Sequence, residues 1–157
     1  MFHAAILSLC LCTQTDLQPL LTFGTDYNQY SYDQAYTLSP LTEQPMIILV
    51  GAEWCPGCVV MKKRMKKILT ELTTEYTRDN IGNIPNSVKS KLTFPVLYVE
   101  IDSDKDPELA RKILTGNSIP QLVVYIPQPD DKWVCRTYKN VQSEEATKAI
   151  LRKAIEQ

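Results

Sequence analysis

Two cysteines separated by two residues are the part of this chain best suited to chemistry. Cys55 and Cys58 stand in the run Trp54-Cys55-Pro56-Gly57-Cys58, between an unbroken apolar segment and a long amphipathic one. Disulfide exchange needs a sulfur held as a thiolate, because the thiolate is the nucleophile. The first turn of a helix favours that anion through its unpaired N–H groups and the positive end of the helix dipole. The pattern therefore predicts a redox pair that exchanges a dithiol for a disulfide with a partner.

Each residue of this motif has an expected place. Pro56 suits the first helical position, where its missing N–H costs nothing, so Cys55 is expected at the helix cap with its sulfur exposed. Cys58 lies almost one turn later, and its sulfur should face that of Cys55. We expect Cys55 to attack a partner's disulfide and Cys58, more buried, to resolve the mixed disulfide. Gly57 would leave room for the partner chain, and Trp54 would cover one side of the site.

Two other interpretations of the cysteine pair stay open at this point. One is half of a zinc site, but zinc usually takes four ligands, and beyond the pair the domain offers only Cys135 and acids, with His3 the single histidine. The other is an inert structural disulfide, for which a strand-to-helix corner beside a tryptophan is an unfavourable place. We predict no metal and no cofactor apart from the Cys55–Cys58 disulfide itself, and we expect Cys135 to be a buried or spare thiol.

The size and charge of the chain narrow the remaining functions. Its 157 residues, 44% of them hydrophobic, predict one globular domain. The formal net charge is -1, so no overall field attracts nucleic acid or an anionic membrane. No segment has the apolar length of a membrane-spanning helix. We expect a monomer with no nucleic-acid partner and no stable membrane span.

The first residues carry a possible export signal. Ala4 to Cys12 is an apolar stretch of the length of a secretory core region, with small residues placed for cleavage before Thr13. Against this, no Lys or Arg precedes the stretch, and a disordered or packed N-terminal segment is the alternative. We divide the chain into a possible signal peptide (1–12), a linker or irregular segment (13–30) and one domain (31–157). This division favours a periplasmic or secreted location over a cytoplasmic one.

The rest of the chain predicts strands and helices in alternation. The apolar run Met46 to Val50, between Pro45 and Gly51, reads as a buried central strand, and its neighbours follow from periodicity, caps and turns. Strands are predicted at 46–50, 96–101, 121–126 and 133–138, and helices at 32–38, 55–76, 106–115 and from 143 onward. The crossovers favour parallel pairing and the turn near Pro129 an antiparallel hairpin. The result is an α/β fold whose central mixed sheet has helices on both faces.

Several of these residues resemble the thioredoxin-like family. The residues that carry the resemblance are Ala52 to Cys58, Val99 to Asp102, and Ile119-Pro120 before an apolar strand. The resemblance covers about residues 30–157. It is strongest for the secreted bacterial thioredoxin-like proteins. It implies a thioredoxin fold and a thiol-disulfide oxidoreductase that acts on protein substrates and is recharged by an upstream redox protein. It also implies a cis Ile119–Pro120 bond facing the cysteines, with the backbone at Ile119 binding an extended partner segment.

Three departures from the family pattern bear on this expectation. Leu49 stands where thioredoxins carry a buried Asp, and Tyr98 stands where they carry its Lys partner, so Glu53 or Glu100 would have to serve in proton transfer. The pair encloses Pro-Gly instead of the usual Gly-Pro, which leaves the direction of electron flow open. The chain between Cys55 and Pro120 is also longer than in plain thioredoxins, and the additional residues fall in the 77–95 connection.

Two further questions stay open. The basic run at 62–67 could attract acidic partners or be a solvated helix face, and the second reading is preferred. The chain could also be a thioredoxin-fold binding module without catalysis, using the Ile119–Pro120 face and the 77–95 loop.

Overall fold

The computed structural model describes residues 29–80, 95–129 and 132–157 of the chain. Within them four strands form one mixed sheet in the order β2-β1-β3-β4, with β1 and β2 parallel and the other pairs antiparallel. The elements in chain order are α1 (Tyr32–Thr42), β1 (Met46–Gly51), α2 (Pro56–Asn80), β2 (Leu97–Asp102), α4 (Pro107–Ile113), β3 (Gln121–Gln128), β4 (Lys132–Lys139) and α5 (Glu144–Ile155). The predicted α/β architecture is confirmed.

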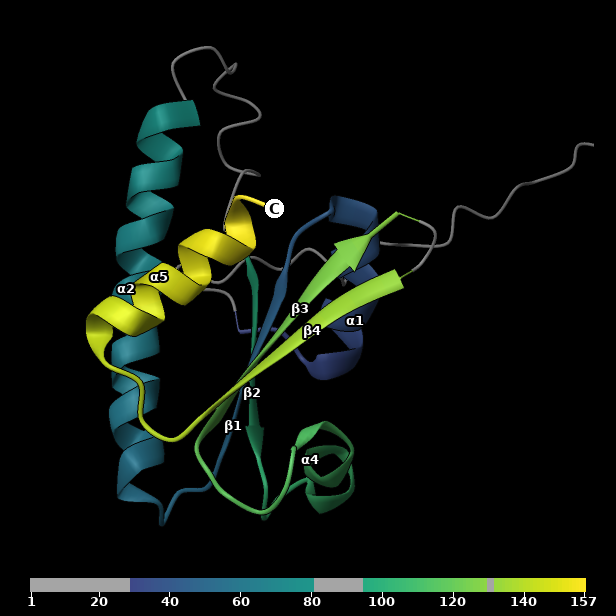
Figure 1. Ribbon diagram of the computed structural model, residues 1–157, viewed down its shortest axis with the longest axis vertical. Coiled ribbons are helices and arrows are strands. Elements are labelled where there is room, and N and C mark those ends of the chain that lie inside the picture. Colours follow the sequence, from purple (N-terminus) through teal and green to yellow (C-terminus); the bar gives the residue numbers. More distant parts are fainter. Residues whose placement is uncertain (1–28, 81–94, 130–131) are drawn as a thin grey trace, which may run out of the picture.

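Helices cover both faces of the sheet (Figure 1), α2 and α5 on one side and α1 and α4 on the other. Every residue of β1 is buried, because this central strand has a neighbouring strand on each edge and helices above and below. Its side chains alternate between the two cores: Ile47 and Leu49 pack toward α2 and α5, and Ile48 and Val50 toward α1 and α4.

The helix starts are set by local sequence. Ser31 caps α1 in a capping box with Gln34, and Ser143 caps α5. Asp106 caps α4 with Pro107 in its first turn. These caps satisfy N–H groups that the first turn of a helix leaves unpaired.

Some predicted boundaries were wrong. α1 continues through Pro40, which lies inside the helix and removes only one backbone donor. α4 ends at Ile113, before the expected residue 115, because Leu114 is extended; Gly116 has a positive φ of 82° in the loop that follows. β3 runs past Ile126 to Gln128, with Pro127 paired opposite Trp133.

Parts of other predictions lie outside the described residues. These are the 1–12 signal peptide, the linker up to residue 28, and the 77–95 connection beyond residue 80. Residue 29 itself forms one isolated parallel bridge to Tyr98, and α2 continues to Asn80.

Ion pairs between α2 and α5 account for part of the basic run. Lys67 lies 2.6 Å from Glu144, and Arg64 donates to the backbone carbonyl of Gln142. Two acids of α2 also pair with α5: Glu71 with Lys148 at 2.5 Å and Glu75 with Arg152 at 2.8 Å. Lys67 of the 62–67 run therefore joins α2 to α5, Arg64 joins α2 to the loop before α5, and Lys62 joins α2 to β2.

Candidate active site

The cysteine motif fills the corner between β1 and α2. The backbone N–H of Cys58 donates to the carbonyl of Cys55 at 3.0 Å, and the N–H of Val59 donates to the same oxygen at 3.2 Å. The N–H of Cys58 also lies 3.2 Å from the Sγ of Cys55, toward which it donates. Cys55 thus precedes the first residue of α2, where the N–H of Cys58 is shared between the carbonyl and the sulfur of Cys55.

Cys55 and Cys58 are joined in a disulfide, with their Cα atoms 5.2 Å apart. Cys55 is 6% exposed and Cys58 is fully buried. The order of burial is as predicted, but Cys55 is more enclosed than expected. Ala52 and Ile119 pack against the pair.

Gly51, the last residue of β1, supports the second cysteine. A Cβ at this position would lie 2.9 Å from the Cβ of Cys58 and 3.0 Å from its Sγ. No side chain fits between the strand and the cysteine, so glycine is required there. The signal for this requirement in the sequence is the glycine that ends the apolar run, four residues before Cys55.

Gly57 lies against the loop between β4 and α5, which includes Val141. A Cβ on Gly57 would lie 2.9 Å from a methyl group of Val141 and 3.4 Å from the Cδ of Pro120. The space expected for a partner chain is therefore shared with Val141, which is itself 45% exposed.

The Ile119–Pro120 peptide bond is cis, which confirms the prediction. The buried side chain of Gln121 holds the loop before it, donating to the carbonyls of Ser118 at 2.7 Å and Thr115 at 3.2 Å. The carbonyl of Pro120 accepts from Asn140. Within the described residues, the backbone N–H and C=O of Ile119 make no hydrogen bond, so they are open to a partner.

The two acids considered for proton transfer lie in different surroundings. Glu53 is 71% exposed and is paired with Lys105 at 2.5 Å; this hydrogen bond raises the pKa of Lys105. Glu100 is 12% exposed, lies 3.3 Å from Lys62 and accepts from the hydroxyl of Tyr98 at 3.0 Å.

Glu100 is the better placed of the two acids for an effect on the second cysteine. Lys62 lies one turn after Cys58 on α2, so its side chain emerges beside that cysteine. On β2, Glu100 is paired with Leu49, two residues before the Gly51 on which Cys58 rests.

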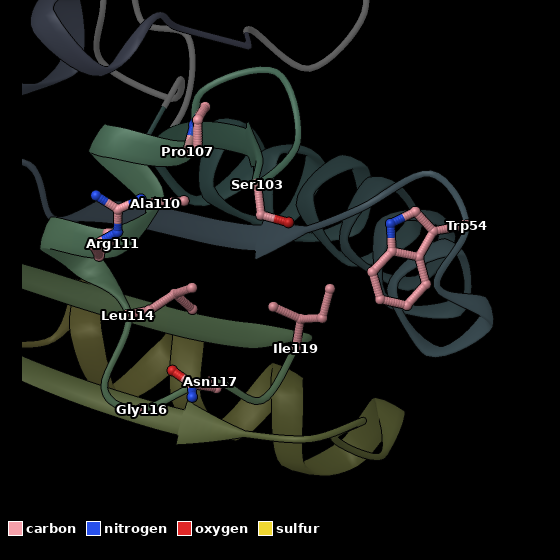
Figure 2. A pocket seen from close by; sticks show the side chains of 9 residues that line it. All are labelled: Trp54, Ser103, Pro107, Ala110, Arg111, Leu114, Gly116, Asn117 and Ile119. Atoms are coloured by element: carbon pink, nitrogen blue, oxygen red, sulfur yellow. The ribbon is translucent and has the colours of Figure 1, made fainter.

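Trp54 projects from the corner with 69% of its surface exposed, and its indole N–H donates to Asp104 at 2.7 Å. It forms one end of a pocket of about 480 Å³ beside the disulfide. Figure 2 shows Trp54 and Ile119 facing α4 across this pocket. Trp54 therefore shapes the groove next to the cysteines.

Cys135 takes no part in this site. It is a free, exposed thiol on β4, directly opposite Tyr125. Burial, and then the neighbouring Cys135, raise the pKa of Tyr125 to about 12. Cys135 was expected to be a buried or spare thiol: its exposure on the edge strand β4 contradicts the first of these, and its free state fits the second.

Among the described residues, no three His, Cys, Asp or Glu side chains gather as metal ligands. The same part of the chain holds no helix long and apolar enough to cross a membrane.

No protein-family model and no curated protein sequence matches this chain. Its likeness to known proteins is found among solved structures. Chloroplastic thioredoxin z superposes with a TM-score of 0.57 at 13% identity, covering 86% of this chain and 99% of that one. Deadhead, a germline-specific thioredoxin of Drosophila melanogaster, gives 0.51 at 15% identity, covering 80% and 96%. A mutant thioredoxin from Halobacterium salinarum gives 0.51 at 16%, covering 82% and 88%.

At such identities the likeness shows the fold alone, and that fold is the thioredoxin fold. The chemistry has to be argued from the site itself.

Proposed function

We propose that this protein is a thiol-disulfide oxidoreductase that exchanges disulfides with protein substrates through Cys55 and Cys58. The observation that carries the proposal is the N–H of Cys58 donating toward the Sγ of Cys55 at the start of α2. That donor would stabilise a thiolate on Cys55 after reduction, which is what a nucleophilic cysteine needs.

The reaction balances without a bound cofactor. The Cys55 thiolate attacks one sulfur of the partner's disulfide, and the partner's other sulfur leaves as a thiolate that takes up a proton. The Cys58 thiol then loses its proton and attacks Cys55, releasing the partner's remaining sulfur. Two electrons pass from the protein's dithiol to the partner, and an upstream redox protein restores the dithiol. The reverse sequence oxidises the partner.

The partner would be held by its backbone. The open N–H and C=O of Ile119 suit an extended segment that adds as a strand beside the cis proline. Trp54, Pro56 and Gly57 border the same face and would contact that segment. Glu100, tied to Lys62, would act on the proton that Cys58 loses.

One observation favours a second candidate, a thioredoxin-fold binding module without catalysis. Cys55 is only 6% exposed, so a partner's sulfur reaches it only after Ile119 or its neighbours give way. A binding module would use the same Ile119 backbone and would leave the disulfide intact.

Reduction of insulin disulfides in the presence of dithiothreitol separates the two candidates. The oxidoreductase predicts activity that is lost in Cys55→Ser and retained in Cys135→Ser, whose thiol lies on a distant edge strand. If wild type and Cys55→Ser were equally active, the binding module would be favoured.

We also propose that the protein is exported from the cytoplasm. The apolar stretch Ala4 to Cys12 supports a periplasmic or secreted location and kinship with secreted bacterial thioredoxin-like proteins. Mass spectrometry of the mature chain tests this, and an N-terminus at Met1 would contradict cleavage.

A further inference from the structure

The pocket beside the disulfide lies where a bound partner would pass. Its lining runs from Trp54 and Ile119 across to α4 and to the loop that follows α4. In the view of Figure 2, Trp54 and Arg111 lie at opposite ends with Ile119 between them. At about 480 Å³ it can take side chains of a polypeptide whose backbone pairs with Ile119.

Arg111 is the only charged residue among the nine that line the pocket. It is exposed on α4, and within the described residues it forms no ion pair, not even with Glu108 three residues earlier on the same helix. Ser103 and Asn117 add polar groups to the lining. A guanidinium donates in a planar fork that matches a carboxylate, so this pocket offers an anion both charge and hydrogen bonds.

The nearby acids have other partners, and among the described residues none of them forms an ion pair with Arg111. Asp104 accepts the indole N–H of Trp54, and Glu53 is paired with Lys105. Asp106 caps α4. The positive charge of Arg111 is therefore available to a ligand.

We propose that this pocket receives an aspartate or glutamate side chain of the partner, so that the protein acts preferentially on disulfides with acidic neighbours. This inference rests on the proposed function and adds its substrate class. An exposed cation at the rim of a site contributes modestly, so the expected preference is about three- to five-fold in the second-order rate constant for reaction of the reduced protein with the peptide.

The test uses a matched pair of peptides. Each has a single cysteine joined to thionitrobenzoate as a mixed disulfide, with aspartates around the cysteine in one peptide and asparagines in the other. The reduced full-length protein is mixed with each peptide, and the released thionitrobenzoate is followed by its absorbance. Arg111→Gln removes the charge in the pocket, while Lys112→Gln removes a charge from the same helix outside the lining.

We expect wild type and Lys112→Gln to prefer the aspartate peptide, and Arg111→Gln to turn over both peptides at the wild-type asparagine rate. Arg111→Lys should keep part of the preference, because the charge remains while the fork is lost. Equal turnover of both peptides by wild type, or an undiminished preference in Arg111→Gln, overturns this inference and leaves the proposed function standing. No turnover of either peptide by wild type overturns both.

Discussion

Gly51 shows how closely the second cysteine is fitted to the end of β1. Any side chain at this position would meet the Cβ and Sγ of Cys58 within 3.0 Å. The atoms involved belong to a disulfide at the start of a helix, and they have little freedom to move aside. The placement of Cys58 therefore depends on a residue that has no chemistry of its own.

We expect Gly51→Ala to lower the free energy of unfolding of the oxidised protein by about 1–3 kcal/mol, the cost typical of overpacking. Urea unfolding followed by circular dichroism measures this. Gly57→Ala is the matched control, because the atom it meets is a methyl group at the end of the Val141 side chain, which can shift. An equal cost for both variants would contradict the special role of Gly51.

Glu100 is the second residue whose role can be isolated. We expect Glu100→Gln to slow release of the partner from the mixed disulfide by about ten-fold or more near neutral pH, since a group acting on the proton of Cys58 is lost. Stopped-flow kinetics across a pH series measures this, and the pH profile should shift along with the rate. Glu53→Gln, exposed and paired with Lys105, is the control. A uniform change with no shift of the profile would mean that Glu100 is only structural.

At the scale of elements, α2 and α5 are joined by pairs that respond to pH. The hydrogen bond from Lys148 lowers the pKa of Glu71 below its ordinary value of 4.5. A lowered folded-state pKa means that the ionised group stabilises the fold above the unfolded-state value, and that this contribution is lost as the pH falls through the folded-state value. The attachment of α5 should therefore weaken in acid.

We expect Glu71→Gln to unfold at a lower urea concentration than wild type at neutral pH, and the difference to shrink as the pH falls below the ordinary carboxyl range and through the lowered folded-state pKa of Glu71. Glu108→Gln, exposed on α4 with no ion pair among the described residues, should match wild type over the same pH range. A difference for Glu71→Gln that persists in acid would point to lost packing instead of lost charge.

The elements that local sequence controls were predictable. Ser143 and Asp106 cap helices through side chains that reach only a few residues along the chain, and β1 follows from an apolar run between Pro45 and Gly51. The helix and strand ends that depend on tertiary packing could not be predicted in this way. α1 passes through Pro40 because the rest of its turns remain paired and Ala35 and Ser39 are buried.

The same division holds for the site. The redox pair and the cis proline could be found from short motifs. Three other features of the site depend on contacts between residues far apart in the chain, which neither periodicity nor spacing predicts. These are the enclosure of Cys55, the placement of Val141 over Gly57 and the pairing of Lys62 with Glu100.

Across the whole molecule, the disulfide lies at the end of the sheet where β1 stops, and the residues that surround it come from three separate stretches of chain. Ala52 and Cys58 belong to the corner after β1, Ile119 and Pro120 to the loop before β3, and Val141 to the loop after β4. A change in any of these loops would therefore alter access to the same sulfur.

The depth of Cys55 has a consequence for what can be turned over. With 6% of that residue exposed, an approaching sulfur reaches it only where Ile119 or a neighbouring residue moves aside. If the proposed oxidoreductase activity holds, a disulfide in a flexible segment should therefore react faster than one fixed within a rigid fold. Reduction rates for a disulfide in an unfolded peptide and for one in a folded domain would measure this difference.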